Sequence, residues 1–145
     1  MSVVFAVLAP RLLAPAVVVA LALVVKGYTD VGDGFSAGVI VGLAIALRYV
    51  TLGPEATERG LPILRHAPAG VAGGLLISIA VGFAPVLWGD PPFSHIPGPG
   101  EAVVHIGTIE LLSAVVFDLG VFVLVTSAIV LLVHHLSSLV AEPGA

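Results

Sequence analysis

Three side chains in the carboxyl-terminal third of the sequence have the chemistry to carry protons or cations. Asp118 lies within a long apolar run, Glu110 comes eight residues before it, and His105 precedes Glu110 by five residues. An ionisable group within a membrane span is costly, so it normally faces protein or water. If the run is helical from residue 109, Glu110 and Asp118 lie about 12 Å apart along nearly one face. We therefore predict Asp118, Glu110 and His105 as ion-pathway candidates.

Each of these residues also has a structural interpretation. Asp118 could be a fixed packing element, hydrogen-bonded to the backbone or to a neighbouring subunit, because buried polar groups join helices in membranes. Glu110 could be an exposed carboxylate at the membrane boundary, and His105 an interfacial histidine. His134 and His135 close the apolar run, where a histidine compensates the helix dipole. The sequence leaves the conducting and the packing roles of Asp118 equally open.

The remaining residues exclude several classes of function. The chain has no cysteine, which excludes disulfides, thiolate metal sites and cysteine nucleophiles. Its histidines and carboxylates lack the spacing of metal ligands or of a nucleophile with its base, so we expect no metal, no cofactor and no enzyme. The net charge of −4 is spread thinly, which argues against nucleic acid and against a polybasic lipid-binding segment.

The composition places these residues in a membrane protein. Of the 145 residues, 59% are hydrophobic and 10% are charged, whereas a soluble domain carries about 25% charged residues. The mean hydropathy is +1.19. Such a chain cannot cover a water-facing surface with polar groups, so the lipid bilayer or partner proteins must cover it. We expect an all-α, multi-pass protein of the cell membrane.

Four stretches are apolar over the length of about 20 residues that a spanning helix needs. We predict a single membrane domain over residues 1–145, with helices at about 3–25, 35–51, 67–88 and 109–136. In the second stretch Gly38 and Gly42 share one face, a spacing typical of close helix packing. Their neighbour could be a helix of this chain or of another subunit.

The arginines predict the orientation of the domain. Arg48, Arg59 and Arg65 flank the second loop, Lys26 stands alone in the first loop, and the third loop has no lysine or arginine. Positive charge is retained on the cytoplasmic side of the membrane. Both termini are therefore expected to be cytoplasmic, and the third loop to lie outside.

The link between the first two predicted helices is the most distinctive segment of the chain. It reads Gly27-Tyr-Thr-Asp-Val-Gly-Asp-Gly-Phe35. As a structural element it is a tight interhelical turn, in which Asp30 or Asp33 could cap the second helix at its positive dipole end.

This link and the fourth stretch resemble the B subunit of Mrp-type multisubunit sodium/proton antiporters, a family also found in membrane-bound hydrogenase-type complexes. The family's link is similar to G-H-N-x-P-G-G-G-F, which Gly27, Gly32, Gly34 and Phe35 match. Its later pattern F-D-x-G-V is the more specific and is met by Phe117-Asp-Leu-Gly-Val121. The link departs from the family at Tyr28, Thr29, Val31 and Asp33.

The resemblance implies a small, non-catalytic subunit of an antiporter or antiporter-like respiratory complex. Its partners would be larger membrane subunits that carry the proton channels, and sodium or protons would be the transported ions. Gly27, Asp33, Gly34 and Phe35 would be structural residues of the link, while Asp118 could help line an ion route. The departures in the link favour a divergent branch, such as a hydrogenase-like assembly.

A different class of function competes with this one, namely a stand-alone, homo-oligomeric small channel or transporter. Transporters of that kind usually contain internal repeats with broken helices in matching positions. The pattern F-x-x-G-V occurs at Phe35 and again at Phe117, which is too short to indicate a duplication.

Overall fold

The computed structural model describes residues 3–26, 33–94, 105–106, 109–110 and 113–141. In chain order its elements are the helix α1 (Val3–Lys26), the helices α2 (Asp33–Leu52) and α3 (Pro54–Gly60), the 3-10 helix η1 (Pro62–His66), the helix α4 (Ala67–Phe83), the 3-10 helix η2 (Ala84–Trp88), the strands β1 (His105–Ile106) and β2 (Ile109–Glu110), and the helix α5 (Ser113–Ala141). Four segments are long and apolar enough to span a membrane, namely Val7–Lys26, Asp33–Leu52, Pro62–Trp88 and Ser113–Leu139. The predicted all-α class with four spans is confirmed.

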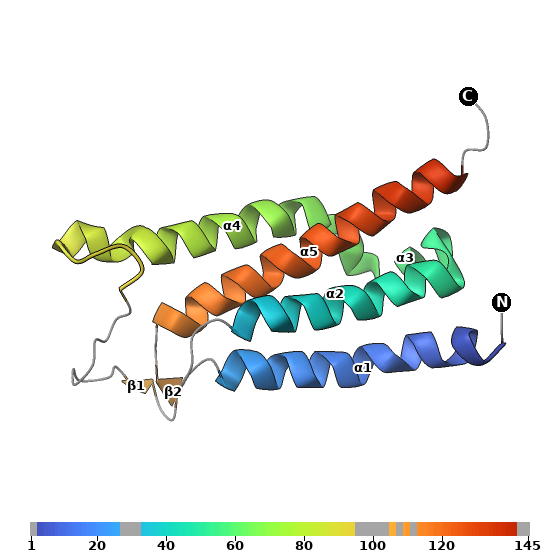
Figure 1. The fold of residues 1–145 in the computed structure, drawn as a ribbon, viewed down its shortest axis with the longest axis horizontal. Helices are drawn as coiled ribbons and strands as arrows, with labels where there is room; N and C mark the ends of the chain where they lie inside the picture. Colours follow the sequence, from blue (N-terminus) through green and yellow to red (C-terminus); the bar gives the residue numbers. More distant parts are fainter. Residues whose placement is uncertain (1–2, 27–32, 95–104, 107–108, 111–112, 142–145) are drawn as a thin grey trace.

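The four long helices form a layer rather than a closed bundle. α2 packs between α1 and α5, and α5 packs between α2 and α4, which gives the spatial order α1, α2, α5, α4 (Figure 1). α1 begins and α5 ends at the side of the molecule where α3 lies (Figure 1). The two central helices therefore connect the outer ones, and their contact holds the layer together.

Close packing between α2 and α5 depends on glycines of α2. A Cβ added at Gly38 would lie 2.8 Å from the Cβ of Val125 and 3.0 Å from the carbonyl oxygen of Phe122. At Gly42 it would lie 2.6 Å from Cδ1 of Ile129. The face that these two glycines share is thus used inside the chain, which decides between the two neighbours that the sequence allowed.

The other side of α5 is packed in the same way. A Cβ added at Gly74 on α4 would lie 2.6 Å from the backbone nitrogen of Leu124 and 2.7 Å from the carbonyl oxygen of Gly120. Ser78, one turn further along α4, donates a hydrogen bond to the carbonyl of Gly74 at 2.9 Å and so satisfies its own hydroxyl. Small residues at these crossings let the backbones approach, as expected of helices that associate within lipid.

The predicted start of the fourth helix was wrong. Residues 109 and 110 form β2, which pairs antiparallel with β1 so that His105 lies opposite Glu110 and Ile106 opposite Ile109. β-branched residues such as isoleucine favour strands over helices. The helix begins only at Ser113 and continues to Ala141, five residues beyond the predicted end.

The other predicted boundaries differ by smaller amounts. The third span is α-helical only to Phe83 and continues as a tighter 3-10 turn to Trp88, because Pro85 lacks the N–H that an α-helix needs at that point. Gly89, with φ +87°, ends this segment in a left-handed conformation that suits glycine. The second span begins at Asp33, two residues earlier than predicted.

Large apolar side chains cover both outer helices and remain exposed in the isolated chain. Leu76 on α4 is 67% exposed, Leu87 on η2 82% and Val25 on α1 70%. Surfaces of this kind are unfavourable in water and require lipid or other apolar helices around them. The layer therefore fits a bilayer, with room for partner helices along its open faces.

Candidate functional site

Asp118 lies where the two central helices cross. Its side chain belongs to the second turn of α5 and is 1% exposed. Gly34, the second residue of α2, lies directly against its backbone: an added Cβ would overlap the carbonyl oxygen and lie 2.8 Å from both the carbonyl carbon and Cα of Asp118. The prediction that Asp118 faces protein rather than lipid is confirmed.

The residue before Asp118 belongs to a small aromatic cluster. The ring of Phe93 stands edge-to-face with that of Phe117 at 6.0 Å and with that of Phe83 at 5.5 Å. The backbone N–H of Phe93 donates to the carbonyl of Gly82 at 2.7 Å, and Gly82 has no side chain that would displace the ring. These contacts hold the segment after η2 against α4 and against the first turns of α5.

The residues of the link have different surroundings. Asp33 is the first residue of α2 and pairs with Lys26 of α1 at 3.3 Å. That Asp30 or Asp33 caps α2 stays a prediction. The two side chains are 24% and 58% exposed, so this pair contributes about 1 kcal/mol or less. Gly34 is buried against α5, whereas Phe35 is 59% exposed and points out of the layer. Gly27 lies outside the described residues.

The structure does not place Glu110 and Asp118 on one helix face. Glu110 lies in β2 and not in α5, so its predicted position eight residues before Asp118 on a shared face is wrong. His105 and Glu110 are instead paired across the hairpin. Sequence distance along an assumed helix gave the wrong relation, because Ile109 and Glu110 form a strand and α5 begins only at Ser113.

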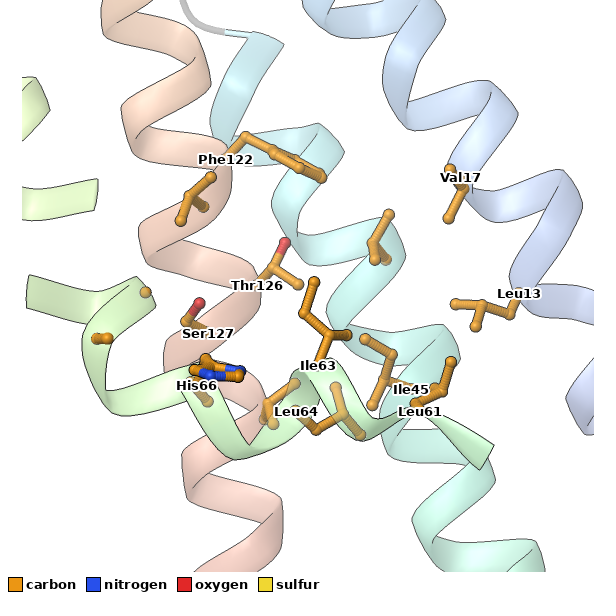
Figure 2. Close-up of a pocket in the computed structure, with 16 residues that line it drawn as sticks. Leu13, Val17, Ile45, Leu61, Ile63, Leu64, His66, Phe122, Thr126 and Ser127 are labelled. Carbon is orange, nitrogen blue, oxygen red and sulfur yellow. The ribbon is translucent and has the colours of Figure 1, made fainter. Parts of the chain in front are cut away.

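A mostly apolar cavity of about 600 Å³ opens in the middle of the layer (Figure 2). Leu13 and Val17 of α1 line one side, and the η1 residues Ile63 and Leu64 close one end. Thr126 is among its few polar lining residues and donates a hydrogen bond to the carbonyl of Gly38 at 3.3 Å. Because the Thr126 hydroxyl is already hydrogen-bonded and most of the lining is apolar, the cavity suits an apolar group better than a hydrated ion.

A second polar cluster was missed by the sequence reasoning. Glu58 of α3 contacts the Nδ1 atom of His134 at 2.7 Å and accepts a hydrogen bond from the Tyr49 hydroxyl at 3.1 Å through the same carboxylate oxygen. The sequence favours a dipole-compensating role for His134 and assigns no role to Glu58. The available signal was the segment Pro54–Gly60, which has proline at its start and Glu55 four residues before Arg59, as in a short helix.

Neither polar cluster has the composition of a metal centre. Over the described residues, no three His, Asp or Glu side chains converge so that they could hold a metal ion. The fold and the buried aspartate define an all-helical protein with four candidate membrane spans and a buried carboxyl residue where α2 and α5 pack together.

A family model described as a domain related to the MnhB subunit of Na+/H+ antiporters matches residues 4–131. The chain belongs to this family, which confirms the resemblance to antiporter B subunits. The family is one of transporter subunits and not of enzymes.

Individual relatives carry related names. The A/B subunit of a probable K(+)/H(+) antiporter from Rhizobium meliloti is 35% identical over 116 residues, which are 79% of this chain and 11% of that protein. The B subunit of a Na(+)/H(+) antiporter from Alkalihalophilus pseudofirmus is 31% identical over 105 residues, 68% of this chain and 67% of the relative. Its counterpart from Bacillus subtilis is 30% identical over 103 residues, 71% and 70% of the two chains.

Proposed function

We propose that this chain is a small, non-catalytic subunit of a multisubunit cation/proton antiporter, which joins neighbouring membrane subunits and places Asp118 beside the route of the transported ion. The exchanged ions would be protons and either Na+ or K+, the cations named for its relatives. One observation carries the proposal. Asp118 is 1% exposed, and its segment Phe117-Asp-Leu-Gly-Val121 packs against Gly34. Both segments match the family.

Burial of this kind supports a functional role for Asp118. A carboxylate at the centre of a membrane helix costs about 2.5–3.5 kcal/mol on insertion scales. Asp118 lies five residues from the start of α5, which is about 8 Å along the helix axis, so its cost is lower than at the centre. The side chain is nevertheless enclosed by protein, where reversible ionisation can be coupled to ion movement.

The family and the open helix layer predict that the chain works only in an assembly. Purified in mild detergent from its native membrane, it should co-purify with several larger membrane subunits, since exposed residues such as Leu76 and Leu87 need apolar neighbours. Mass spectrometry of the co-purified proteins identifies the parent complex. Antiporter-type subunits alone indicate an antiporter, whereas additional redox subunits indicate a hydrogenase-type complex.

The same purification tests the competing class of function. A stand-alone channel or transporter would purify as a homo-oligomer and would exchange ions when reconstituted into vesicles without other subunits. That result would overturn the subunit proposal.

The orientation of the chain is a further prediction. We expect α3 to face the cytoplasm and the η2 end of α4 to face the outside, because arginines surround α3. The natural chain has no cysteine, so single cysteines at exposed positions can report the side. An impermeant thiol reagent added to intact cells should label Asp90→Cys and should label Glu55→Cys only after permeabilisation; the opposite pattern would reverse the topology.

A further inference from the structure

The cluster around Glu58 joins three helices at the arginine-flanked end of the layer. Tyr49 comes from the last turns of α2, Glu58 from α3 and His134 from the distal part of α5, 76 residues later in the sequence. His134 is sixteen residues beyond Asp118, which is about 24 Å along α5. The cluster therefore lies at the opposite end of the central helix pair from the buried aspartate.

Geometry fixes where a proton can be held. A separation of 2.7 Å between Nδ1 of His134 and Oε1 of Glu58 requires a hydrogen between the two atoms. When the imidazole is neutral, a hydrogen on Nδ1 leaves Nε2 as the atom that gains and loses a proton. Glu58 thus orients the ring and selects its tautomer, in the way that carboxylates orient functional histidines elsewhere.

The surroundings allow exchange with water on one side and contact with the interior on the other. The side chains of His134 and Glu58 are 46% and 40% exposed, and α3 connects two spans at the boundary of the apolar region. Tyr49 is 4% exposed and belongs to the buried core. Its hydroxyl links the carboxylate to the interior of the layer.

A cavity of about 290 Å³ adjoins the cluster, and further ionisable side chains line it. Arg65 of η1 and His135 of α5 line this cavity together with Tyr49, Glu58 and His134. The ring of His135 has its Nδ1 on the carbonyl oxygen of its own helix residue Leu131, at 2.8 Å, rather than on another helix.

The remaining charges of α3 are engaged elsewhere. Glu55 and Arg59 pair with each other at 3.8 Å and are 90% and 77% exposed, so they belong to the aqueous side. Among the described residues, the ionisable groups that line the cavity of about 290 Å³ together with His134 are Tyr49, Glu58, Arg65 and His135.

We propose that Glu58 and His134 form a proton-exchange site, at which the complex takes up or releases the proton that it exchanges for a cation. The transfer needs only water as the other reactant. Nε2 of His134 accepts a proton from water or hydronium to give the imidazolium, and it returns the proton to water to give the neutral ring. The proposal rests on the proposed antiporter function, since that function supplies the transported proton.

The site itself can be tested in the isolated full-length chain. The sequence has five histidines, so 15N-labelled histidine in lipid nanodiscs gives a small set of ring signals that single substitutions can assign. We expect neutral His134 to carry its hydrogen on Nδ1 and to accept its second proton at Nε2, and Glu58→Gln to shift its signals and leave those of His66 on η1 in place. Signals of His134 that do not respond to Glu58→Gln would overturn the site.

Its role in transport is tested in the intact complex with a matched pair of variants. His134→Asn keeps a donor toward Glu58 but has no imidazole to protonate, and His66→Asn makes the same change at an exposed histidine at the end of η1, outside the Glu58 cluster. In inverted vesicles, His134→Asn should lower antiport several-fold and change its pH profile, while His66→Asn should retain the wild-type rate and pH profile.

The outcomes separate this inference from the proposed function. Equal pH profiles for wild type and His134→Asn, at normal subunit content, would reject proton exchange at this site. Loss of subunit content in His134→Asn would make the contact a structural tie and would also reject it. Failure of the wild-type chain to co-purify with any antiporter subunit would instead reject the proposed function, a result that does not depend on His134.

Discussion

Replacement of Gly34 by alanine is expected to push apart α2 and α5 and to lower the amount of assembled complex. The new Cβ would overlap the backbone of Asp118, with the carbonyl carbon and Cα at 2.8 Å. A backbone cannot rotate away as a flexible side chain does, so the helices must shift. Overpacking of this kind costs about 1–3 kcal/mol, and it would act directly on the segment that carries the buried carboxylate.

Gly73→Ala provides the matched control. Gly73 lies within α4, and a Cβ added there would have no atom within 4 Å. Alanine is favoured over glycine inside a helix by about 1 kcal/mol, so this variant should be neutral or slightly stabilising. Subunit content after purification and the thermal unfolding midpoint of the complex measure both effects. Equal behaviour of the two variants would show that the Gly34 contact is not a tight one.

The four spans could be predicted from the sequence because a single property decides them. Apolar length fixes which segments can cross the bilayer, and Asp118 could be assigned to the protein interior because a lipid-facing carboxylate is costly. The contact between Gly34 and Asp118 joins two segments that both match the family. Each segment could be assigned a role separately, but neither pattern indicated that the two touch.

The order of the helices could not be predicted in the same way. A membrane helix is apolar on all sides, so its sequence does not show which face meets a neighbour. Gly38 and Gly42 indicated close packing without naming α5 as the partner. Glu58 and His134 are 76 residues apart, and each alone resembles an ordinary boundary residue. The strand at Glu110 was missed because it directly precedes a long apolar helix, and the pattern of a short apolar segment does not by itself separate a strand from a helix.

The largest effect on transport is expected from substitution of Asp118, and two variants distinguish the roles that the carboxylate could have. Asp118→Asn retains the size and the ability to form hydrogen bonds but cannot ionise. Asp118→Ala removes both properties and leaves a gap in the buried position that the side chain occupies, since Asp118 is 1% exposed.

If Asp118 takes part in ion movement, both variants should lower cation-dependent proton exchange by about tenfold or more, equivalent to about 1.4 kcal/mol in the barrier. Sodium- or potassium-dependent pH changes in inverted vesicles measure this, with subunit content determined in the same preparation. Asp90→Asn is the control, because it makes the same chemical change at an exposed position after η2 and should leave exchange unchanged.

A packing role gives a different pattern. Asparagine would then be tolerated, since it can still accept and donate hydrogen bonds across the helix crossing, while alanine would reduce assembly because it removes a polar side chain that joins the helices. Full exchange by Asp118→Asn at normal subunit content would therefore take the carboxylate out of the ion route. The chain would then use this residue to hold α5 in place, and the proton chemistry would have to lie elsewhere in the assembly.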